Sequence, residues 1–257
     1  MNSRNISNMG KPGPFSGFAW VFWLTAFVLA GQSAPARAET FNAKYQVRLT
    51  GVSIGTVHLS GDVMAGAYMV TLKGDVSLLG FSARFEASSD GLTRAAAVVP
   101  ARYRLRTEGT VDRTVTVNFS PDRTAAVTID PALSDSEKRG LVPLEASHRT
   151  NAIDPMSALI SQLIRVSRSE DPCAGVAQVF TGASRFDVNI IAGSTKANEI
   201  ECRAVHQPIA GHRPTGNERP TSAVIAFPKT ERAGGLRLPT RIEVPLSLGT
   251  ITIRRIG

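Results

Sequence analysis

Apolar and polar residues alternate along the chain from residue 41 onward. Phe41, Ala43, Tyr45, Val47 and Leu49 occupy every second position, with polar residues between them. This period of two is typical of a strand that buries one face. The pattern returns at Tyr68-Val70-Leu72, Phe81-Ala83-Phe85-Ala87, Tyr103-Leu105 and Val115-Val117-Phe119. Strands at such short spacing predict an antiparallel sheet or barrel and argue against β–α–β units.

Residues that favour turns separate these runs. They are Gly51, Gly55, Gly66, Gly74, the Asp90-Gly91 pair and the Ser120-Pro121-Asp122 triplet. Glycine reaches positive φ angles without steric cost, and proline, serine and aspartate stabilise tight turns. We therefore expect a chain reversal at each of these positions.

One segment has the period of a helix. Asp154 is a suitable N-cap, and Pro155 fits the first helical position. An apolar stripe follows at helical spacing, and the basic residues Arg165 and Arg168 complement the macrodipole at its C-terminal end. The stripe consists of Met156, Leu159, Ile160, Leu163 and Ile164. We expect a helix over about residues 154–166, and its stripe is either core or the lining of a ligand cavity.

After Pro172 the strand pattern resumes in six runs, at 176–181, 185–191, 200–206, 222–227, 241–244 and 250–254. A loop rich in proline and glycine is expected over 207–220, and 130–151 is the least regular connection. The predicted fold is all-β: a strongly curved antiparallel sheet, or a partly open β-barrel, around one amphipathic helix. Two stacked sheets are the alternative arrangement.

The first 38 residues contain the three parts of a secretory signal peptide. Arg4 and Lys11 are basic, the stretch from Pro12 to Pro35 has no charge, and Ala36-Arg37-Ala38 is an Ala-x-Ala cleavage site. We predict cleavage after Ala38, export to the periplasm, and one β-rich domain over residues 39–257.

The alternatives for this segment are an uncleaved membrane anchor and a lipoprotein signal. A long apolar run can anchor a protein in a bilayer without cleavage, but Gly17, Gly31 and Pro35 interrupt the run and favour cleavage. A lipoprotein signal needs a cysteine to receive the lipid, and Gln32 stands at that position. The segment therefore favours a cleaved, non-acylated signal.

Charge and cysteine content narrow the class further. Removing Arg4, Lys11 and Arg37 with the signal lowers the net charge from +8 to +5, because residues 1–38 hold no acid. This modest excess is spread along the chain and does not call for a nucleic-acid partner. Cys173 and Cys202 are the two cysteines of the chain. In an oxidising compartment such a pair is most simply one disulfide.

The segment Gly51-Val52-Ser53-Ile54-Gly55 has the G-x-S-x-G spacing of a hydrolase nucleophile elbow. That motif requires a strand that turns sharply into a helix. Here strand alternation continues through His58, so we interpret the segment as a hairpin turn and expect no catalytic serine. A serine hydrolase that uses Ser53 is the enzymatic alternative.

Two further groups have a functional and a plainer interpretation. Cys173, Cys202, His206 and His212 could ligate zinc only if both cysteines were reduced, so we expect no metal and no cofactor. Arg102, Arg104 and Arg106 share one face of a strand and are candidates for binding an anion such as a lipid headgroup, although a solvated outer face is the favoured interpretation. Asp154 and Asp187 are not brought together by any pattern, so no acid–base role is assigned to them.

Short motifs along most of the chain resemble a bacterial family known as domain of unknown function 3108. They are Tyr45-x-Val47, Gly51-Val52-x-Ile54-Gly55, Pro100-x-x-Tyr103, Asp154-Pro155-x-Ser157-Ala158-Leu159, Val179-Phe180-x-Gly182 with Arg185-Phe186-Asp187, Cys202 with Pro208-Ile209-Ala210-Gly211, Val244-Pro245 and Leu248-Gly249. The resemblance implies an exported, β-rich envelope protein and supplies no catalytic residues. The architecture is also similar to β-clam and β-spiral proteins, but this is an analogy of fold.

These observations favour a non-enzymatic periplasmic envelope protein that binds an amphiphilic ligand, such as a lipid, or a protein partner in a concave sheet. A structural protein that maintains the envelope is the alternative.

Overall fold

The computed structural model describes residues 39–257, except 79, 95–96, 110, 169–170, 197, 215–220, 231 and 233–234. These described residues belong to one compact unit. The predicted signal peptide, its cleavage site and the alternative membrane anchor lie outside the described residues. No helix within the described residues is both long enough and apolar enough to cross a bilayer.

Strands dominate the described part of the chain. In the N-terminal half they are β1 (Glu39–Leu49), β2 (Val52–Met64), β3 (Ala67–Leu78), β4 (Phe81–Arg94), β5 (Ala97–Glu108), β6 (Arg113–Phe119) and β7 (Ala125–Asp130). In the C-terminal half they are β8 (Gly175–Phe180), β9 (Arg185–Thr195), β10 (Glu199–Ala210), β11 (Thr221–Pro228), β12 (Arg241–Leu246) and β13 (Gly249–Arg255). Between the halves lie the short helix α1 (Asp135–Lys138), the 3-10 turn η1 (Ala146–Arg149) and the helix α2 (Pro155–Arg168).

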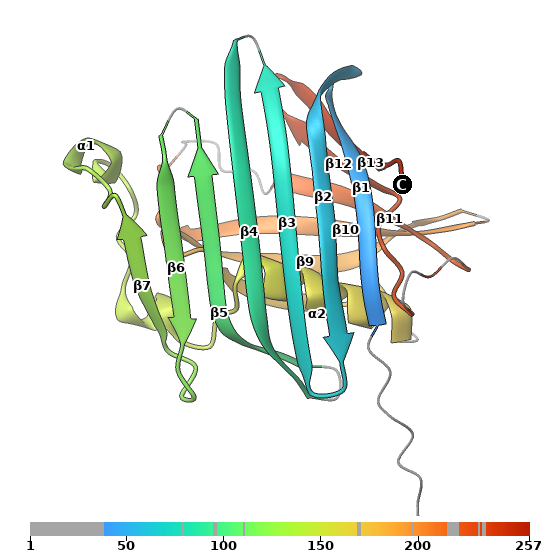
Figure 1. The fold of residues 1–257 in the computed structure, drawn as a ribbon, viewed down its shortest axis with the longest axis horizontal. Coiled ribbons are helices and arrows are strands. Elements are labelled where there is room, and N and C mark those ends of the chain that lie inside the picture. Colours follow the sequence, from blue (N-terminus) through green and yellow to red (C-terminus); the bar gives the residue numbers. More distant parts are fainter. Residues whose placement is uncertain are drawn as a thin grey trace, which may run out of the picture. The chain divides into compact units, whose positions relative to one another are not determined.

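All these strands form one antiparallel sheet in the order β7-β6-β5-β4-β3-β2-β1-β13-β12-β11-β10-β9-β8. The sheet does not close, so β7 and β8 are its two edges. In Figure 1 the strands of the C-terminal half run across behind those of the N-terminal half, with α2 among them. The prediction of an all-β, curved antiparallel sheet around one helix is confirmed, and the arrangement is a single sheet, not two stacked sheets.

Strand β1 follows the alternation of its sequence. Phe41, Ala43, Tyr45 and Val47 are each at most 5% exposed and lie in the core, whereas the intervening side chains face outward. The turn after β1 has two residues, Thr50 and Gly51, with φ of 48° and 87°. Positive φ at both positions is the signature of the hairpin turn whose twist matches that of the strands.

The prediction of turns at the other glycines was right only in part. Gly66 lies in the turn between β2 and β3, but Gly55, Gly74 and the Asp90-Gly91 pair lie inside strands. A Cβ at Gly55 would come within 2.1 Å of the Asp75 carbonyl oxygen, and one at Gly74 within 2.2 Å of the Phe85 ring. These glycines permit a close approach across the sheet, the second common use of glycine in a strand.

The predicted loop over 207–220 is also too long. Strand β10 continues to Ala210, because the pairing with β9 shifts register after Pro208 and tolerates its missing N–H. The irregular connection over 130–151 contains α1, which has a capping box between Ser134 and Glu137.

The segment that precedes α2 joins the two edges of the sheet. The Ile153 N–H donates to the Gln178 carbonyl at 2.8 Å and the Phe180 N–H donates to the Ile153 carbonyl at 2.9 Å, so Ile153 extends the sheet beside β8. Two residues earlier, the Asn151 N–H donates to the carbonyl of Arg123, in the turn that leads into β7, at 3.0 Å. One short stretch of chain therefore contacts both edges and continues directly into the helix.

Candidate functional site

Helix α2 has two different apolar faces. Met156, Ile160, Leu163 and Ile164 are each at most 4% exposed and belong to the core, where α2 packs mainly on β4 and β5. The other face carries Pro155, Ala158, Leu159, Ser161, Gln162 and Arg165, which are only partly buried. The stripe predicted from the sequence is thus divided: Leu159 lines a cavity, and the other four residues pack in the core.

A buried polar cluster fixes the N-terminus of α2. The Asp154 carboxylate is fully buried, and its Oδ1 accepts the backbone N–H groups of Met156 and Ser157 at 2.9 Å each. Its Oδ2 accepts the hydroxyls of Ser157 and of Ser89 on β4, the latter at 3.0 Å. The Ser157 hydroxyl also lies 2.6 Å from the Tyr68 hydroxyl on β3. The N-cap therefore attaches the helix to two strands as well as satisfying its first turn.

Burial is the largest influence on the pKa values of the acidic groups in and beside this cluster. It raises the pKa of the Asp154 carboxyl, and the hydrogen bonds from Ser157, Ser89 and Met156 oppose that rise. Burial, reinforced by the nearby Asp154 charge, raises the pKa of Tyr68 to about 12. The same two causes raise the pKa of Tyr103 on β5. The tyrosines therefore stay neutral hydrogen-bonding groups at physiological pH.

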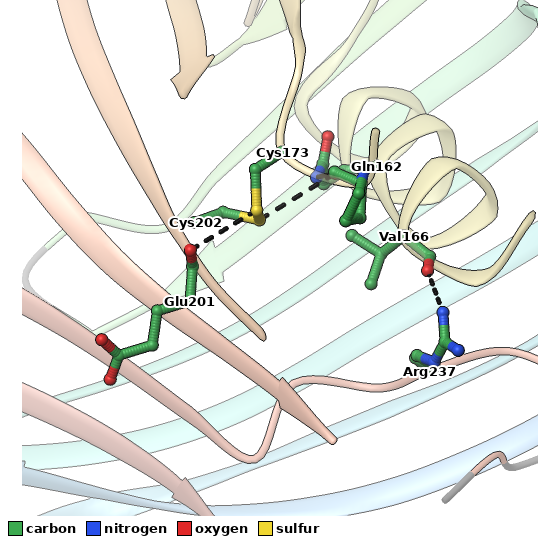
Figure 2. Close-up of a disulfide and its surroundings, with 7 residues drawn as sticks. Gln162, Val166, Cys173, Glu201, Cys202 and Arg237 are labelled. Carbon is green, nitrogen blue, oxygen red and sulfur yellow. Dashed lines mark hydrogen bonds between the residues drawn. A yellow bond between two sulfur atoms is a disulfide. The ribbon is translucent and has the colours of Figure 1, made fainter. Parts of the chain in front are cut away.

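The C-terminus of α2 is held by the segment before β12. The Arg237 guanidinium donates to the Val166 carbonyl, as Figure 2 shows, and the Arg237 backbone N–H donates to the Ser167 hydroxyl at 2.7 Å. Arg168 forms an ion pair with Glu39, the first residue of β1, at 2.7 Å. The Val166 carbonyl, in the turn where helix carbonyls lack intrahelical partners, is in this way satisfied by a cationic group.

A disulfide continues this bracing toward the C-terminal half of the sheet. The sulfur atoms of Cys173, just before β8, and Cys202 on β10 are 2.01 Å apart, at bonding distance as expected from the sequence. Figure 2 shows Gln162 beside the bridge, and its Nε2 donates to the Pro172 carbonyl at 2.9 Å. The helix, the bridge and β10 thus form one connected group.

A cavity of about 210 Å³ lies between the second face of α2 and the inner face of β8–β12. Its walls on the sheet side are almost entirely apolar, formed by Gly175, Val176, Ala177, Val188, Ile190, Ala204, Ile225, Phe227, Pro239 and Ile242. Several of these point inward and are nevertheless only half-buried, namely Val188, Ala204, Ile225 and Ile242. All four line the cavity, and Val188, Ala204 and Ile225 also pack on the core along part of their surface.

The other hollows of the described surface are less suited to a ligand. A groove of about 370 Å³ on β2–β5 is lined by His58, Arg106 and other charged residues, most of which neutralise one another in exposed pairs such as Lys73–Glu86 at 3.2 Å and Arg84–Asp75 at 3.0 Å. A larger hollow of about 610 Å³ lies beside β7, but much of its wall comes from the irregular connection over 132–149.

The three arginines predicted as an anion site are exposed on the same face of β5. Arg106 is paired with Glu108 at 2.9 Å, while Arg102 stands opposite Asp90 on β4 and Arg104 opposite Ser88. Arg106 also lines the groove on β2–β5, whereas Arg102 and Arg104 are not among the residues that line that groove. The arrangement is that of an outer strand face in contact with solvent.

The residues of the hydrolase and zinc interpretations are not assembled into sites. Ser53 is exposed in β2, with the Gln46 amide as its partner at 3.4 Å, and a strand follows it where the elbow needs a helix. The His206 ring contacts the Phe186 ring at a tilt of 46° with centroids 4.6 Å apart, and burial lowers the pKa of His206. Within the described residues no three histidine, cysteine or acidic side chains are grouped as metal ligands. Asp187 is paired with Arg185 at 2.6 Å, far along the chain from the buried Asp154 cap.

The open sheet, its inserted helix and the apolar cavity place this chain among barrel-like all-β proteins. A solved structure with this architecture is the "Beta-barrel-like Protein of Domain of Unknown Function DUF1849 from Brucella abortus". It superposes with a TM-score of 0.53 at 8% sequence identity, covering 86% of this chain and 98% of that chain, so the likeness concerns the fold alone.

The family model of the proteins of unknown function DUF3108 matches residues 44–254, and the chain belongs to this family. The resemblance seen in the sequence motifs is therefore confirmed. No curated protein matches the chain.

Proposed function

We propose that this protein is exported to the periplasm and there binds a single-chain amphiphile, without catalysis, in the cavity between α2 and β8–β12. The observation that carries the proposal is the row of inward-facing, half-buried apolar side chains on β9–β12. An inner sheet face gains stability by covering such residues, at about 25 cal/mol for each Å² of apolar surface removed from water. An alkyl chain would supply that cover.

The size of the cavity limits the ligand. Pockets for drug-sized molecules span about 300–1,000 Å³, and this cavity of about 210 Å³ is smaller. It suits one short acyl or alkyl chain better than a phospholipid with two chains.

The framework of the cavity supports binding by a preformed site. Helix α2 is fixed at its N-terminus by Asp154, at its C-terminus by Arg237, and beside its middle by the disulfide. Ligand sites are usually formed before the ligand arrives, because ordering them on binding would reduce the affinity.

Export is supported by the signal-peptide pattern of residues 1–38 and by one structural feature. The Cys173–Cys202 bridge is of the kind that persists in an oxidising compartment.

The first test is native mass spectrometry of protein purified gently from the periplasm of cells that express the full chain. We expect a mature mass that starts at Glu39, together with added mass that departs on denaturation. Absence of the chain from the periplasmic fraction would refute export. A bare protein would favour the alternative, a structural envelope protein.

Binding is then measured with N-phenyl-1-naphthylamine, a neutral probe that fluoresces in apolar surroundings. Ala204→Phe fills the cavity from β10 and Ala158→Leu fills it from α2, and each should weaken probe binding at least ten-fold. Ala126→Phe, on the exposed face of β7, is the matched control and should leave binding unchanged. Equal binding by all four proteins would place the probe elsewhere and refute the site. A thermal melt of each variant separates loss of the site from loss of the fold.

A further inference from the structure

Three arginines lie at the C-terminal end of α2 or against it, and they differ in their partners. Arg168 is paired with Glu39 at 2.7 Å, and Arg237 donates to backbone carbonyls. Arg165 lines the cavity and, among the described residues, has neither an ion-pair nor a hydrogen-bond partner. It is half-buried, so its charge is partly removed from water without compensation.

The guanidinium of Arg165 turns its face toward the position that a side chain would occupy on Gly175. A Cβ built on Gly175 would be 3.4 Å from each of Cζ, Nε and Nη2, and equal distances to three atoms of a planar group place that point over the plane. The N–H donors of a guanidinium lie in its plane. The donors of Arg165 therefore point past Gly175 and not at it.

The remaining polar groups of the cavity do not compete for Arg165. Its other polar side chains are Ser161 and Gln162, and the Gln162 amide already donates to Pro172. None of the lining residues is acidic. The Arg237 guanidinium at the Val166 carbonyl also offsets the negative end of the helix dipole, which would otherwise repel an anion.

We infer that Arg165 binds the oxyanion headgroup of the amphiphile, a carboxylate or a phosphate, while the apolar wall on β9–β12 holds its chain. This inference rests on the proposed function and specifies its ligand. A guanidinium matches either oxyanion through two parallel N–H donors. One cationic group beside an apolar wall of this size suits an amphiphile with one anionic headgroup and one chain.

The test compares three ligands of equal chain length, namely decanoate, decyl phosphate and decanol, by displacement of N-phenyl-1-naphthylamine at pH 8. The proteins are the wild type, Arg165→Gln and Arg165→Lys. Arg102→Gln removes an equal charge from the outer face of β5 and is the matched control. Hydrogen bonds to charged groups correspond to about a ten-fold to hundred-fold change in affinity.

We expect the wild type and Arg102→Gln to bind at least one anion ten-fold or more tightly than decanol. In Arg165→Gln this preference should vanish while decanol binding stays the same, and Arg165→Lys should keep part of it. The preferred anion identifies the headgroup as carboxylate or phosphate. Equal affinity for anion and alcohol in the wild type, or an unchanged preference in Arg165→Gln, would overturn the role of Arg165 and leave the proposed function standing. Failure of the probe and of all three ligands to bind would instead refute the proposed function.

Discussion

The attachment of α2 to the sheet through Asp154 leads to a quantitative prediction. Replacing Asp154 by alanine removes the acceptor of the Met156 and Ser157 N–H groups and of two hydroxyls. The hydroxyls of Ser89 and Ser157 keep partners, since they lie 3.1 Å apart and both are within reach of Tyr68. The two N–H groups do not.

Loss of an N-cap costs about 1–2 kcal/mol, and a buried donor left without a partner costs about 1–3 kcal/mol. Removal of a buried charge offsets part of this sum. We expect Asp154→Ala to lower the free energy of unfolding by about 2–3 kcal/mol. Asp154→Asn keeps an oxygen for both N–H groups, and the hydroxyls can rotate to accept from its amide, so it should cost less than about 1 kcal/mol.

Urea denaturation of the purified, oxidised protein measures both variants. With an m-value of about 2–3 kcal/mol/M, the alanine variant should unfold at a urea concentration about 1 M lower than the wild type. A difference below about 0.5 kcal/mol for alanine, or an equal loss for asparagine and alanine, would refute the role given to this cap.

The difference in stability between Asp154→Asn and the wild type should depend on pH. Because burial raises the pKa of the Asp154 carboxyl in the folded state, the folded state favours the protonated acid. The stability that this group contributes is therefore present at low pH and declines as the pH rises above 3.8, the pKa of the carboxyl in the unfolded chain. The stability of Asp154→Asn relative to the wild type should increase between pH 3 and pH 7, and a constant or decreasing difference would contradict the assignment.

Two further changes test how the halves of the sheet are held together. Replacing both Cys173 and Cys202 by serine opens a loop that spans 29 residues in sequence. Urea denaturation should show that the free energy of unfolding falls by about 3–4 kcal/mol. A fall of less than about 1 kcal/mol would mean that the disulfide contributes little to stability. Gly182 has a φ of +94°, and the Cβ that Gly182→Ala adds would lie within 2.5 Å of the Val115 side chain on β6. It should lower the thermal midpoint by several degrees, since left-handed backbone alone costs about 1–2 kcal/mol. Gly140→Ala has a positive φ but open space around it, so it reports the backbone cost without the contact.

The strands and the helix could be predicted from the sequence because each has one buried face. The alternation of Phe41 to Leu49 and the spacing from Met156 to Ile164 record that burial directly. The glycines led to wrong turn predictions, because Gly55 and Gly74 allow close contacts between strands. A single sequence does not distinguish such a glycine from one that forms a turn.

The cavity could not be predicted, because it depends on two segments far apart in the chain. Nothing in the sequence distinguishes Ala158 on α2 and Ala204 on β10 from other alanines, and only the fold brings both of them to the wall of one cavity. The sequence assigned Arg165 to the helix dipole, and its place in the cavity wall distinguishes it from Arg168, which is paired with Glu39. The one available signal was Leu159, which lies at the edge of the helical stripe, packs against the core and also lines the cavity.

The segment from Asn151 to Ile153 also affects how copies of the protein meet one another. An open sheet normally offers the unpaired backbone of its edge strands to other chains, which is a common route to aggregation. Here Ile153 occupies the carbonyl of Gln178 and the N–H of Phe180 on β8. The chain thus protects one exposed edge with its own backbone, using the residues that lead into Asp154 and the helix. Any change that releases the helix would uncover that edge, so loosening of α2 and the onset of self-association should occur together.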